Sequence, residues 1–454
     1  MFRIIVYWVS LLVVGVCGAV ERPNVVVFFV DDLGWADLGC YGSRLHETPH
    51  IDALAKSGLR FTDAYAAASI CSPTRASLMT GKHPVRVGIT DWIPGSGDKG
   101  KVLDTPEDAF ELALEEVTVA EAMGEAGYGT FYAGKWHLGG RAFGPDRQGF
   151  EVTFDPHNDP SKGSPKRLKR GVEGRPHDTV GITREAVGFL EKNVGERPVF
   201  MVLSYYDVHT PIVAEAKHLA RYEAKVAALG EGGEAIVERD GLSRGRQDNA
   251  AFASMVSAVD DSVGEVLAKL EVLGISDETV VIFTSDNGGL STKKTVGPTS
   301  NLPLRAGKGW LYEGGIRVPL IVRVPGLTGV GKASGVPVVT MDLYPTVLGV
   351  AGLEKRPEQH VDGVDVFGKS EREAIFWHYP HYHGSMWRPG GAVRSGKWKL
   401  VEFFETGSVE LYDLEADPGE RFDLVNREKQ VAEEMWLKLK DWQEGIGARM
   451  PSRR

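Results

Sequence analysis

The sequence is poor in cysteine, in long apolar segments and in positive charge. Three cysteines in 454 residues are too few for a disulfide framework, and a chain of this length builds a core without one. After residue 20 no apolar run is long enough to cross a membrane, so no stable membrane insertion is expected. The formal net charge of −10 argues against a nucleic-acid-binding protein, which would need a basic face. What remains is a large globular protein without internal repeats.

The first 19 residues have the form of a secretory signal peptide. Arg3 supplies the positive start, residues 4–16 are apolar, and Cys17-Gly18-Ala19 offers a small-residue cleavage site. We therefore expect an exported protein, periplasmic or secreted. Lipidation of Cys17 is the weaker alternative, because Val16 is bulky where a small residue is expected.

Short apolar runs alternate with helical patterns over the first 350 residues. The runs are Asn24–Val30, 129–133, 199–203 and 279–283, and helical patterns occupy 51–57, 118–126, 183–192 and 250–273. The first run is apolar at every position after Asn24, which is typical of a strand buried on both faces. The alternation predicts an α/β sheet with helices on both faces.

A second, smaller unit is predicted toward the C-terminus. The chain turns polar near residues 354–372, and we place a domain boundary there, between a unit at 20–355 and an α+β subdomain at 370–454. Runs at 374–379, 391–404 and 409–414 predict an antiparallel sheet, and an amphipathic pattern over 428–444 predicts a last helix. The polar span 157–175 is expected to be a long surface loop, and 214–249 is a second polar span.

Four of the predicted strands end in polar residues suited to chemistry. They lead to Asp31-Asp32, to Lys135 and His137, to His209, and to Asp286-Asn287. Ligands of α/β sheets bind outside the carboxyl ends of the strands, so these residues are expected to share one site. Each acidic pair alone is more often a loop cap, but the combined set of oxygen ligands favours Ca²⁺ or Mg²⁺ over Zn²⁺. Calcium is preferred because it tolerates loose geometry.

The segment Cys71-Ser72-Pro73-Thr74-Arg75 predicts a reactive residue at the start of a helix. Ser72 is a good N-cap, and Pro73 suits the first helical position. The positive helix end would then lie beside Cys71, with Arg75 one turn away, and the pKa of the thiol is expected to be depressed. A half-buried cysteine before an ordinary capped helix is the alternative.

The Cys-x-Pro-x-Arg pattern resembles the signature of formylglycine-dependent, arylsulfatase-like sulfatases, in which the cysteine is oxidised to formylglycine. Further segments resemble motifs of this family in the family's order, over roughly residues 22–350. They are Asp31-Asp32, Gly134-Lys135-Trp136-His137-Leu138-Gly139, His209-Thr210-Pro211, Ser285-Asp286-Asn287-Gly288, and the stretches 303–308 and 313–319. With the predicted export, the chain is similar to the bacterial polysaccharide sulfatase branch.

The resemblance implies a fold, a metal and a maturation step. The fold would be an alkaline-phosphatase-like α/β sandwich, with a large mixed, mostly parallel sheet flanked by helices and a small C-terminal antiparallel sheet with a helix. One Ca²⁺ would be bound by Asp31, Asp32, Asp286, Asn287 and residue 71 as formylglycine. A formylglycine-generating enzyme would oxidise Cys71.

The family chemistry then assigns a role to each residue. One hydroxyl of the hydrated aldehyde attacks sulfur, and collapse to the aldehyde later expels sulfate. Asp286 would help the nucleophile lose its proton, Arg75 and Lys135 would hold the charged hydrate, and His137 would be the base for the collapse. His209 and Lys308 would hold sulfate oxygens and protonate the leaving alcohol.

The substrate is expected to be a sulfated carbohydrate, of galactose or hexosamine type. Trp92 is a candidate sugar-stacking platform; packing under a loop is equally open. The polar-aromatic run at 377–383 could bind sugar hydroxyls, with His378 and His381 as the candidate residues, and a partly buried strand edge is equally open. A basic run could meet further sulfates or be a solvated loop: Lys162, Lys166, Arg167, Lys169 and Arg170. A phosphonate or phosphodiester hydrolase and an inactive glycan-binding relative stay as alternatives.

Overall fold

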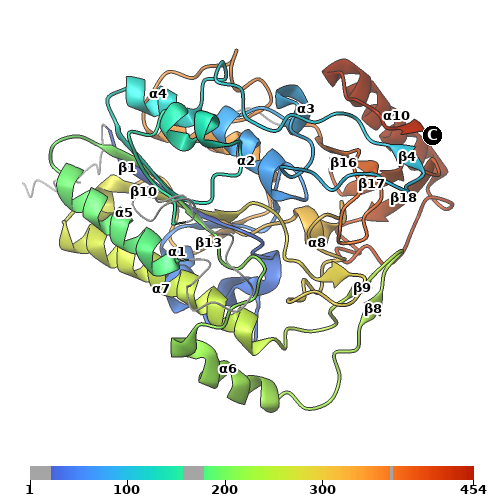
Figure 1. Cartoon of the computed structure of the whole chain (residues 1–454), viewed down its shortest axis with the longest axis horizontal. Helices are drawn as coiled ribbons and strands as arrows, with labels where there is room; N and C mark the ends of the chain where they lie inside the picture. The colour runs from blue at the N-terminus through green and yellow to red at the C-terminus, as the bar shows by residue number, and fades with distance from the viewer. Residues whose placement is uncertain (1–21, 157–177, 369–371) are drawn as a thin grey trace, which may run out of the picture.

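The structure is a computed structural model that describes residues 22–156, 178–368 and 372–454. The predicted signal peptide and the whole predicted 157–175 loop, with its basic run, lie outside the described residues. Figure 1 shows a central sheet covered by helices on both sides, with the C-terminal part of the chain at one end of the molecule. Among the described residues, no helix combines the length and the apolar character needed to cross a membrane.

The central sheet of the described chain contains eight strands in the order β13-β2-β12-β10-β1-β7-β5-β6. Most of them run parallel, and β12 is antiparallel to both of its neighbours. The prediction of a mixed, mostly parallel sheet is confirmed. The strands are β1 (Asn24–Val30), β2 (Leu59–Phe61), β5 (Gly129–Gly134), β6 (Val152–Phe154), β7 (Val199–Tyr205), β10 (Thr279–Ser285), β12 (Leu320–Arg323) and β13 (Lys332–Ser334).

The central strand β1 contributes to a hydrophobic core on each face of the sheet. Its alternate residues face opposite ways: Val25, Val27 and Phe29 join one core, and Val26, Phe28 and Val30 join the other. This explains why its sequence shows no alternation of apolar and polar residues. One core packs under α2 (Cys71–Thr80), α4 (Val119–Glu125) and α9 (Leu343–Val350), and the other under α1 (Pro49–Ser57), α5 (Thr179–Asn193) and α7 (Ala250–Val272).

The C-terminal part forms the predicted antiparallel sheet with a helix on one face. The sheet consists of β15 (Ile375–Tyr379), β16 (Gly390–Ser395), β17 (Trp398–Phe403) and β18 (Ser408–Asp413), and α10 (Lys429–Ile446) packs against it. The other face of this sheet packs against the N-terminal part of the chain. In the hydrophobic core between them, Trp377 and Trp387 lie with Tyr65 and Trp310. The exact domain boundary remains a prediction.

Three sequence expectations about local structure were wrong. The run 391–404 is two strands, because Gly396 adopts φ +56° in a tight turn that pairs Ser395 with Trp398. The polar span 214–249 contains the helix α6 (Ala216–Ala227), which Figure 1 shows at the edge of the molecule. Helix α2 begins at Cys71 rather than after Ser72, so Ser72 is not its N-cap.

The remaining elements are short. They are β3 (Ala64–Tyr65), α3 (Pro84–Val87), β4 (Leu103–Asp104), β8 (Ile236–Val237), β9 (Leu242–Ser243), β11 (Thr292–Lys293), α8 (Glu313–Ile316), β14 (Val338–Val339) and β19 (Ser452–Arg453).

Candidate active site

The carboxyl ends of four adjacent parallel strands bring the polar residues of the sequence motifs together. Strands β10, β1, β7 and β5 are neighbours in the sheet, and Val30 is in register with Ser285 on one side and Tyr205 on the other. Asp31 and Asp286 therefore leave the sheet side by side. The expectation that these strand ends converge on one site is confirmed.

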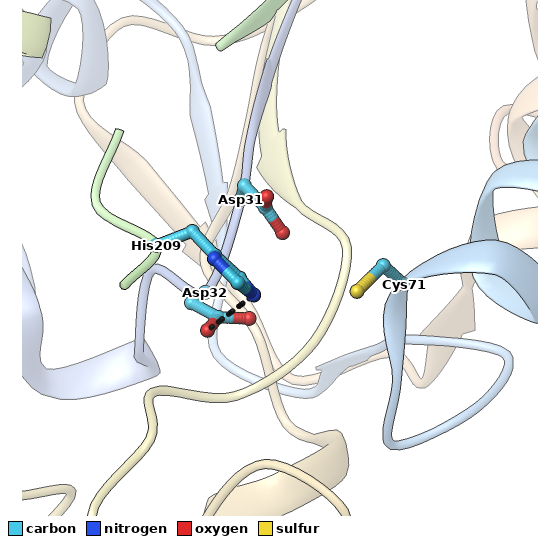
Figure 2. A group of neighbouring side chains, drawn as sticks. All are labelled: Asp31, Asp32, Cys71 and His209. Carbon is cyan, nitrogen blue, oxygen red and sulfur yellow. Dashed lines mark ion pairs between the residues drawn. The ribbon is translucent and has the colours of Figure 1, made fainter. Parts of the chain in front are cut away.

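Asp31, Asp32, Cys71 and His209 form the centre of the site. One ligand atom from each residue lies within 4.8 Å of the others. Figure 2 shows the thiol of Cys71, at the start of α2, facing the two carboxylates and the imidazole from the opposite side. The site is thus built between the strand ends and the N-terminus of a helix, where backbone N–H groups favour negative charge.

The Asp32 side of the site carries one lysine and one histidine. Lys308 Nζ lies 2.6 Å from Asp32 Oδ1, and His209 Nε2 lies 3.7 Å from Asp32 Oδ2. Burial would raise the pKa of Asp32, but the charge of Lys308 holds it below its ordinary value. Burial and the same lysine lower the pKa of His209. The structure thus brings both predicted residues, Lys308 and His209, next to Asp32.

The Asp31 side carries Lys135 and Arg75. Lys135 Nζ is 2.6 Å from Asp31 Oδ2. Arg75 is fully buried; its Nε and Nη2 donate to Asp286 Oδ2 at 3.0 and 2.6 Å, and its Nη1 donates to Ser204 Oγ and to the Lys135 carbonyl. Four hydrogen bonds fix the guanidinium, so Arg75 positions Asp286 and the Lys135 backbone together.

Three buried oxygens at the centre have no hydrogen-bond partner among the described residues. They are Asp31 Oδ1, Asp32 Oδ2 and Asn287 Oδ1. The Asn287 amide is oriented by its Nδ2, which donates to Asp32 Oδ1 at 2.8 Å. Buried oxygens are rarely left without a partner, and three hard oxygens in one place fit a cation such as Ca²⁺ or Mg²⁺.

The charges at the site also fit a cation. Burial and the nearby Asp31 carboxylate raise the pKa of Asp286 to about 7. Asp286 Oδ1 accepts one hydrogen bond, from the Asp32 N–H, and keeps a second lone pair for a cation, whereas Oδ2 accepts both bonds from Arg75. A divalent cation among the three free oxygens would offset the repulsion between these carboxylates.

Cys71 lies at the start of a helix, as the sequence predicted, but the pKa of its thiol differs from the expected direction. The residue is 2% exposed, and burial raises the pKa of the thiol although Lys135 and Lys308 act to lower it. The expectation of a depressed pKa was wrong. It took account of the positive helix end but not of burial, which disfavours the charged thiolate. Ser72, expected as the N-cap, accepts a hydrogen bond from the Ile93 N–H instead.

His137 has one ring nitrogen fixed and the other without a partner. Its Nε2 lies 2.7 Å from the Ile93 carbonyl oxygen; a carbonyl only accepts, so Nε2 carries the proton. Nδ1 is buried without a partner among the described residues. Burial and the charge of Lys135 hold the pKa of His137 well below its usual range. A neutral imidazole with a free Nδ1 is a proton acceptor.

Trp92 lies beside His137, with the ring centroids 6.5 Å apart. Its indole Nε1 donates to Ser96 Oγ and its backbone N–H to Asp91 Oδ1. Asp91 also accepts from the hydroxyl of Tyr379 on β15, so the C-terminal sheet supports the Trp92 loop. Trp92 is partly exposed, as a stacking platform at the rim requires.

The other two predicted substrate-binding residues are buried in packing positions. His378 Nε2 bonds to the Arg449 carbonyl and its Nδ1 to Gln443, so both ring nitrogens are used. His381 Nε2 bonds to Thr90 Oγ1, behind the Trp92 loop. Each is 4% exposed, which corrects the expectation that they bind sugar hydroxyls.

The same sequence run contains a histidine that the prediction missed. His383 is partly exposed, and the charges of Lys308, Asp32 and His209 all act on it. Burial lowers its pKa to about 3, which keeps the ring neutral. The signal in the sequence was the run itself; which of its histidines faces the site depends on how the loop after β15 folds.

Comparison with protein families and known structures agrees with these motifs. The family described as sulfatase matches residues 23–353, and the family described as N-sulphoglucosamine sulphohydrolase, C-terminal, matches residues 306–445. Together the two matches span both the large sheet and the C-terminal sheet.

Individual relatives match over nearly the whole chain. Arylsulfatase A from Homo sapiens is 34% identical over 96% of this chain and 90% of its own length. N-acetylgalactosamine-6-sulfatase from Canis lupus familiaris is 30% identical, over 90% of this chain and 83% of its own. The crystal structure of Ps i-CgsB in complex with k-i-k-neocarrahexaose has a TM-score of 0.74 and 30% identity, covering 93% of this chain and 92% of that one.

Proposed function

The chain belongs to the sulfatase family of sulfuric ester hydrolases and has the alkaline-phosphatase-like fold of that family, and from this premise we propose that it releases sulfate from a sulfated carbohydrate, using a formylglycine made from Cys71 and one calcium ion. One observation carries the proposal. Three buried oxygens that find no hydrogen-bond partner in the part of the chain that the structure describes gather opposite Cys71. This arrangement suits a cation held next to a reactive residue.

Four residues are proposed to hold the calcium ion together with residue 71. They are Asp31, Asp32, Asp286 and Asn287. When bound, the ion would stabilise negative charge on the reacting oxygens and on the sulfuryl group. With three carboxylates against Arg75, Lys135 and Lys308, a divalent cation leaves the pocket with excess positive charge, which suits an anionic ester.

Residue 71 is proposed to act as formylglycine, made by a formylglycine-generating enzyme. Its hydrated aldehyde would supply the hydroxyl that attacks sulfur. The high pKa of the Cys71 thiol makes the unmodified side chain a poor nucleophile at neutral pH. Oxidation to an aldehyde removes the need for a thiolate.

Proton transfer and charge stabilisation are proposed to be shared between residues on the Asp31 side and residues on the Asp32 side of the site. On the Asp31 side, Lys135 and Arg75 hold the nucleophile, and His137 accepts a proton at its free Nδ1. On the Asp32 side, Lys308 and His209 contact sulfate oxygens and donate a proton to the leaving alcohol. Charged groups fixed by buried hydrogen bonds need no reorganisation during the reaction, which is where electrostatic catalysis gains most.

The substrate is proposed to be a galactose- or hexosamine-type sugar sulfate, part of a polysaccharide fragment. The relatives support this class, since one is named as acting on N-acetylgalactosamine 6-sulfate and another holds a neocarrahexaose. Trp92 supports it independently, because a partly exposed indole beside His137 can stack on a sugar face. Export through the predicted signal peptide would bring the enzyme to such a polymer.

The proposal is tested in two steps. The first is the mass of the tryptic peptide at residues 61–75 from protein expressed in its own host, where an aldehyde in place of the thiol is expected. The second is sulfate release from N-acetylgalactosamine 6-sulfate, galactose sulfates and carrageenan oligosaccharides, with matched phosphonate monoesters alongside. If phosphonates are hydrolysed faster than sulfates, the protein is a phosphonate hydrolase and the proposed activity is wrong. An unmodified Cys71 in the native host would favour a glycan-binding protein without enzyme activity.

A further inference from the structure

We propose that His383 is a specificity-determining residue, which donates a hydrogen bond from Nε2–H to an oxygen of the sugar that carries the sulfate. The proposal rests on the proposed function, since it names a contact of the leaving sugar in the same site. His383 lies in the loop between β15 and β16, on the C-terminal sheet rather than on the strand ends that carry the other site residues.

The loop fixes the imidazole beside the catalytic lysine. A Cβ placed on Gly309, the residue after Lys308, would lie 2.2 Å from His383 Nδ1. The ring therefore lies against the backbone of Gly309. Trp310 Nε1 donates to the Ser385 carbonyl at 2.8 Å, and the Met386 N–H donates to the His383 carbonyl at 3.0 Å. The first of these bonds joins the two loops, and the second closes a turn within the loop that carries His383.

Hydrogen bonds within the loop decide which nitrogen of His383 carries the proton. The backbone N–H of Ser385 donates to Nδ1 at 3.2 Å, and Ser385 Oγ lies 2.7 Å from the same nitrogen. A backbone N–H only donates, so Nδ1 is an acceptor and the neutral ring carries its proton on Nε2. Among the described residues, no hydrogen-bond partner of Nε2 is found, and the residue is partly exposed. The outer end of the ring is therefore a free donor.

The position of His383 assigns this donor to the sugar rather than to the nucleophile. The charges that act on His383 are those of Lys308, Asp32 and His209, which make up the Asp32 side of the site. This is the side proposed to face the leaving alcohol. A sugar oxygen next to the sulfate ester would meet a neutral donor there, in addition to the two basic side chains. A fixed donor that a substrate oxygen satisfies discriminates against analogues that lack the oxygen.

Two substitutions separate a substrate contact from a structural role. In His383→Gln the side-chain amide can reach the position of Nε2 but not that of Nδ1. In His383→Asn it can replace Nδ1 toward Ser385 but cannot reach the Nε2 position. Each variant and the parent enzyme are assayed on 4-nitrophenyl sulfate, which has no sugar and no hydroxyl next to the ester, and on the sugar sulfate that the panel above shows to be hydrolysed fastest.

A sugar contact predicts that His383→Asn loses about tenfold in kcat/KM on the sugar sulfate, as expected for one hydrogen bond. The Asn variant should keep its rate on 4-nitrophenyl sulfate, and His383→Gln should stay close to the parent on both substrates. The inference is overturned if Asn behaves like the parent on the sugar, or if both substrates lose equally, as a structural role predicts. If the parent hydrolyses the aryl sulfate and no sugar sulfate, the proposed carbohydrate substrate fails and this inference with it.

Discussion

Lys399 Nζ lies 2.9 Å from Glu313 Oε1, and neither side chain is exposed to solvent. Lys399 is on β17 of the C-terminal sheet, whereas Glu313 begins α8, the short helix whose Gly315 carbonyl accepts from the Gly288 N–H next to Asn287. Lys399 also pairs with Glu420 at 2.8 Å. One buried cation thus joins the C-terminal sheet to the backbone that carries a proposed metal ligand.

Replacing Lys399 with Met should destabilise the protein strongly, because it removes the cation that two buried carboxylates share and leaves only Arg317, 3.6 Å from Glu313 Oε2, beside them. Loss of one partner of a buried ion pair costs about 3–5 kcal/mol, and we expect a decrease of that size in the free energy of unfolding measured with urea. Lys397→Met is the control: its pair with Asp413 lies at the surface, where solvent screens the charges, so the free energy of unfolding should hardly change. Equal effects of the two substitutions would contradict the role given to Lys399.

Cys71→Ala should abolish sulfate release and leave the fold intact. The substitution removes the thiol that is needed for oxidation of Cβ to the aldehyde, but it creates little space, so the free energy of unfolding should change by about 1 kcal/mol or less. Turnover of 4-nitrocatechol sulfate and circular dichroism measure the two effects. Cys40→Ala is the control and should keep its activity. Activity of Cys71→Ala near that of the parent would refute the proposed nucleophile.

Removal of the metal should lower stability as well as activity. Without a cation, the Asp31 and Asp32 carboxylates repel each other inside a buried pocket. Calcium at about 100 times its Kd should add about 2.7 kcal/mol to the free energy of unfolding, seen as a higher Tm than in EDTA. Asn287→Ala should reduce this response, whereas Asp261→Asn, at a surface ion pair, should keep it. A Tm that is the same in EDTA and in calcium would exclude the proposed site.

Asp37→Asn should change how stability depends on pH. Asp37 is fully buried, accepts from Thr299 and Gln247, and burial raises its pKa to about 7. An acid whose pKa is higher folded than unfolded binds its proton more tightly when folded, so its contribution to stability is lost as pH rises from about 4 to about 7.

The Asn variant has no such proton. Its free energy of unfolding relative to the parent should therefore increase between pH 4.5 and 7.5, by at most about 4 kcal/mol. Urea unfolding at three pH values across this range measures the difference. Profiles of parent and variant that stay parallel would show that the pKa of Asp37 is not raised in the folded protein.

Much of the fold could be predicted because local sequence and tertiary structure agree. The bounds of β1 were predicted correctly, since a run that is apolar at every position after Asn24 can only be buried on both faces. The convergence of Asp31, Asp286 and His209 followed from the parallel order of the strands. Helix α6 was not predicted because its sequence is mostly polar. The helix buries only His218 and Tyr222, so it lacks a clear apolar pattern.

The substrate side of the site was harder to predict for a physical reason. His378, His381 and His383 lie within six residues, and nothing in their local sequence distinguishes them. His378 forms a hydrogen bond with the Arg449 carbonyl and His381 with Thr90, whereas His383 lies against Gly309. These contacts join segments that are far apart in the chain.

The sequence by itself determined the four strands that lead to the site, the order of the chemical motifs and the residue types of the active site, because hydrophobic pattern and ligand chemistry are local properties. Tertiary structure alone decided the pKa of Cys71, the four hydrogen bonds of Arg75 and the choice of His383 over its neighbours. Burial and electrostatic interactions depend on which distant segments surround a residue. For that reason they follow from the folded chain and not from any short stretch of it.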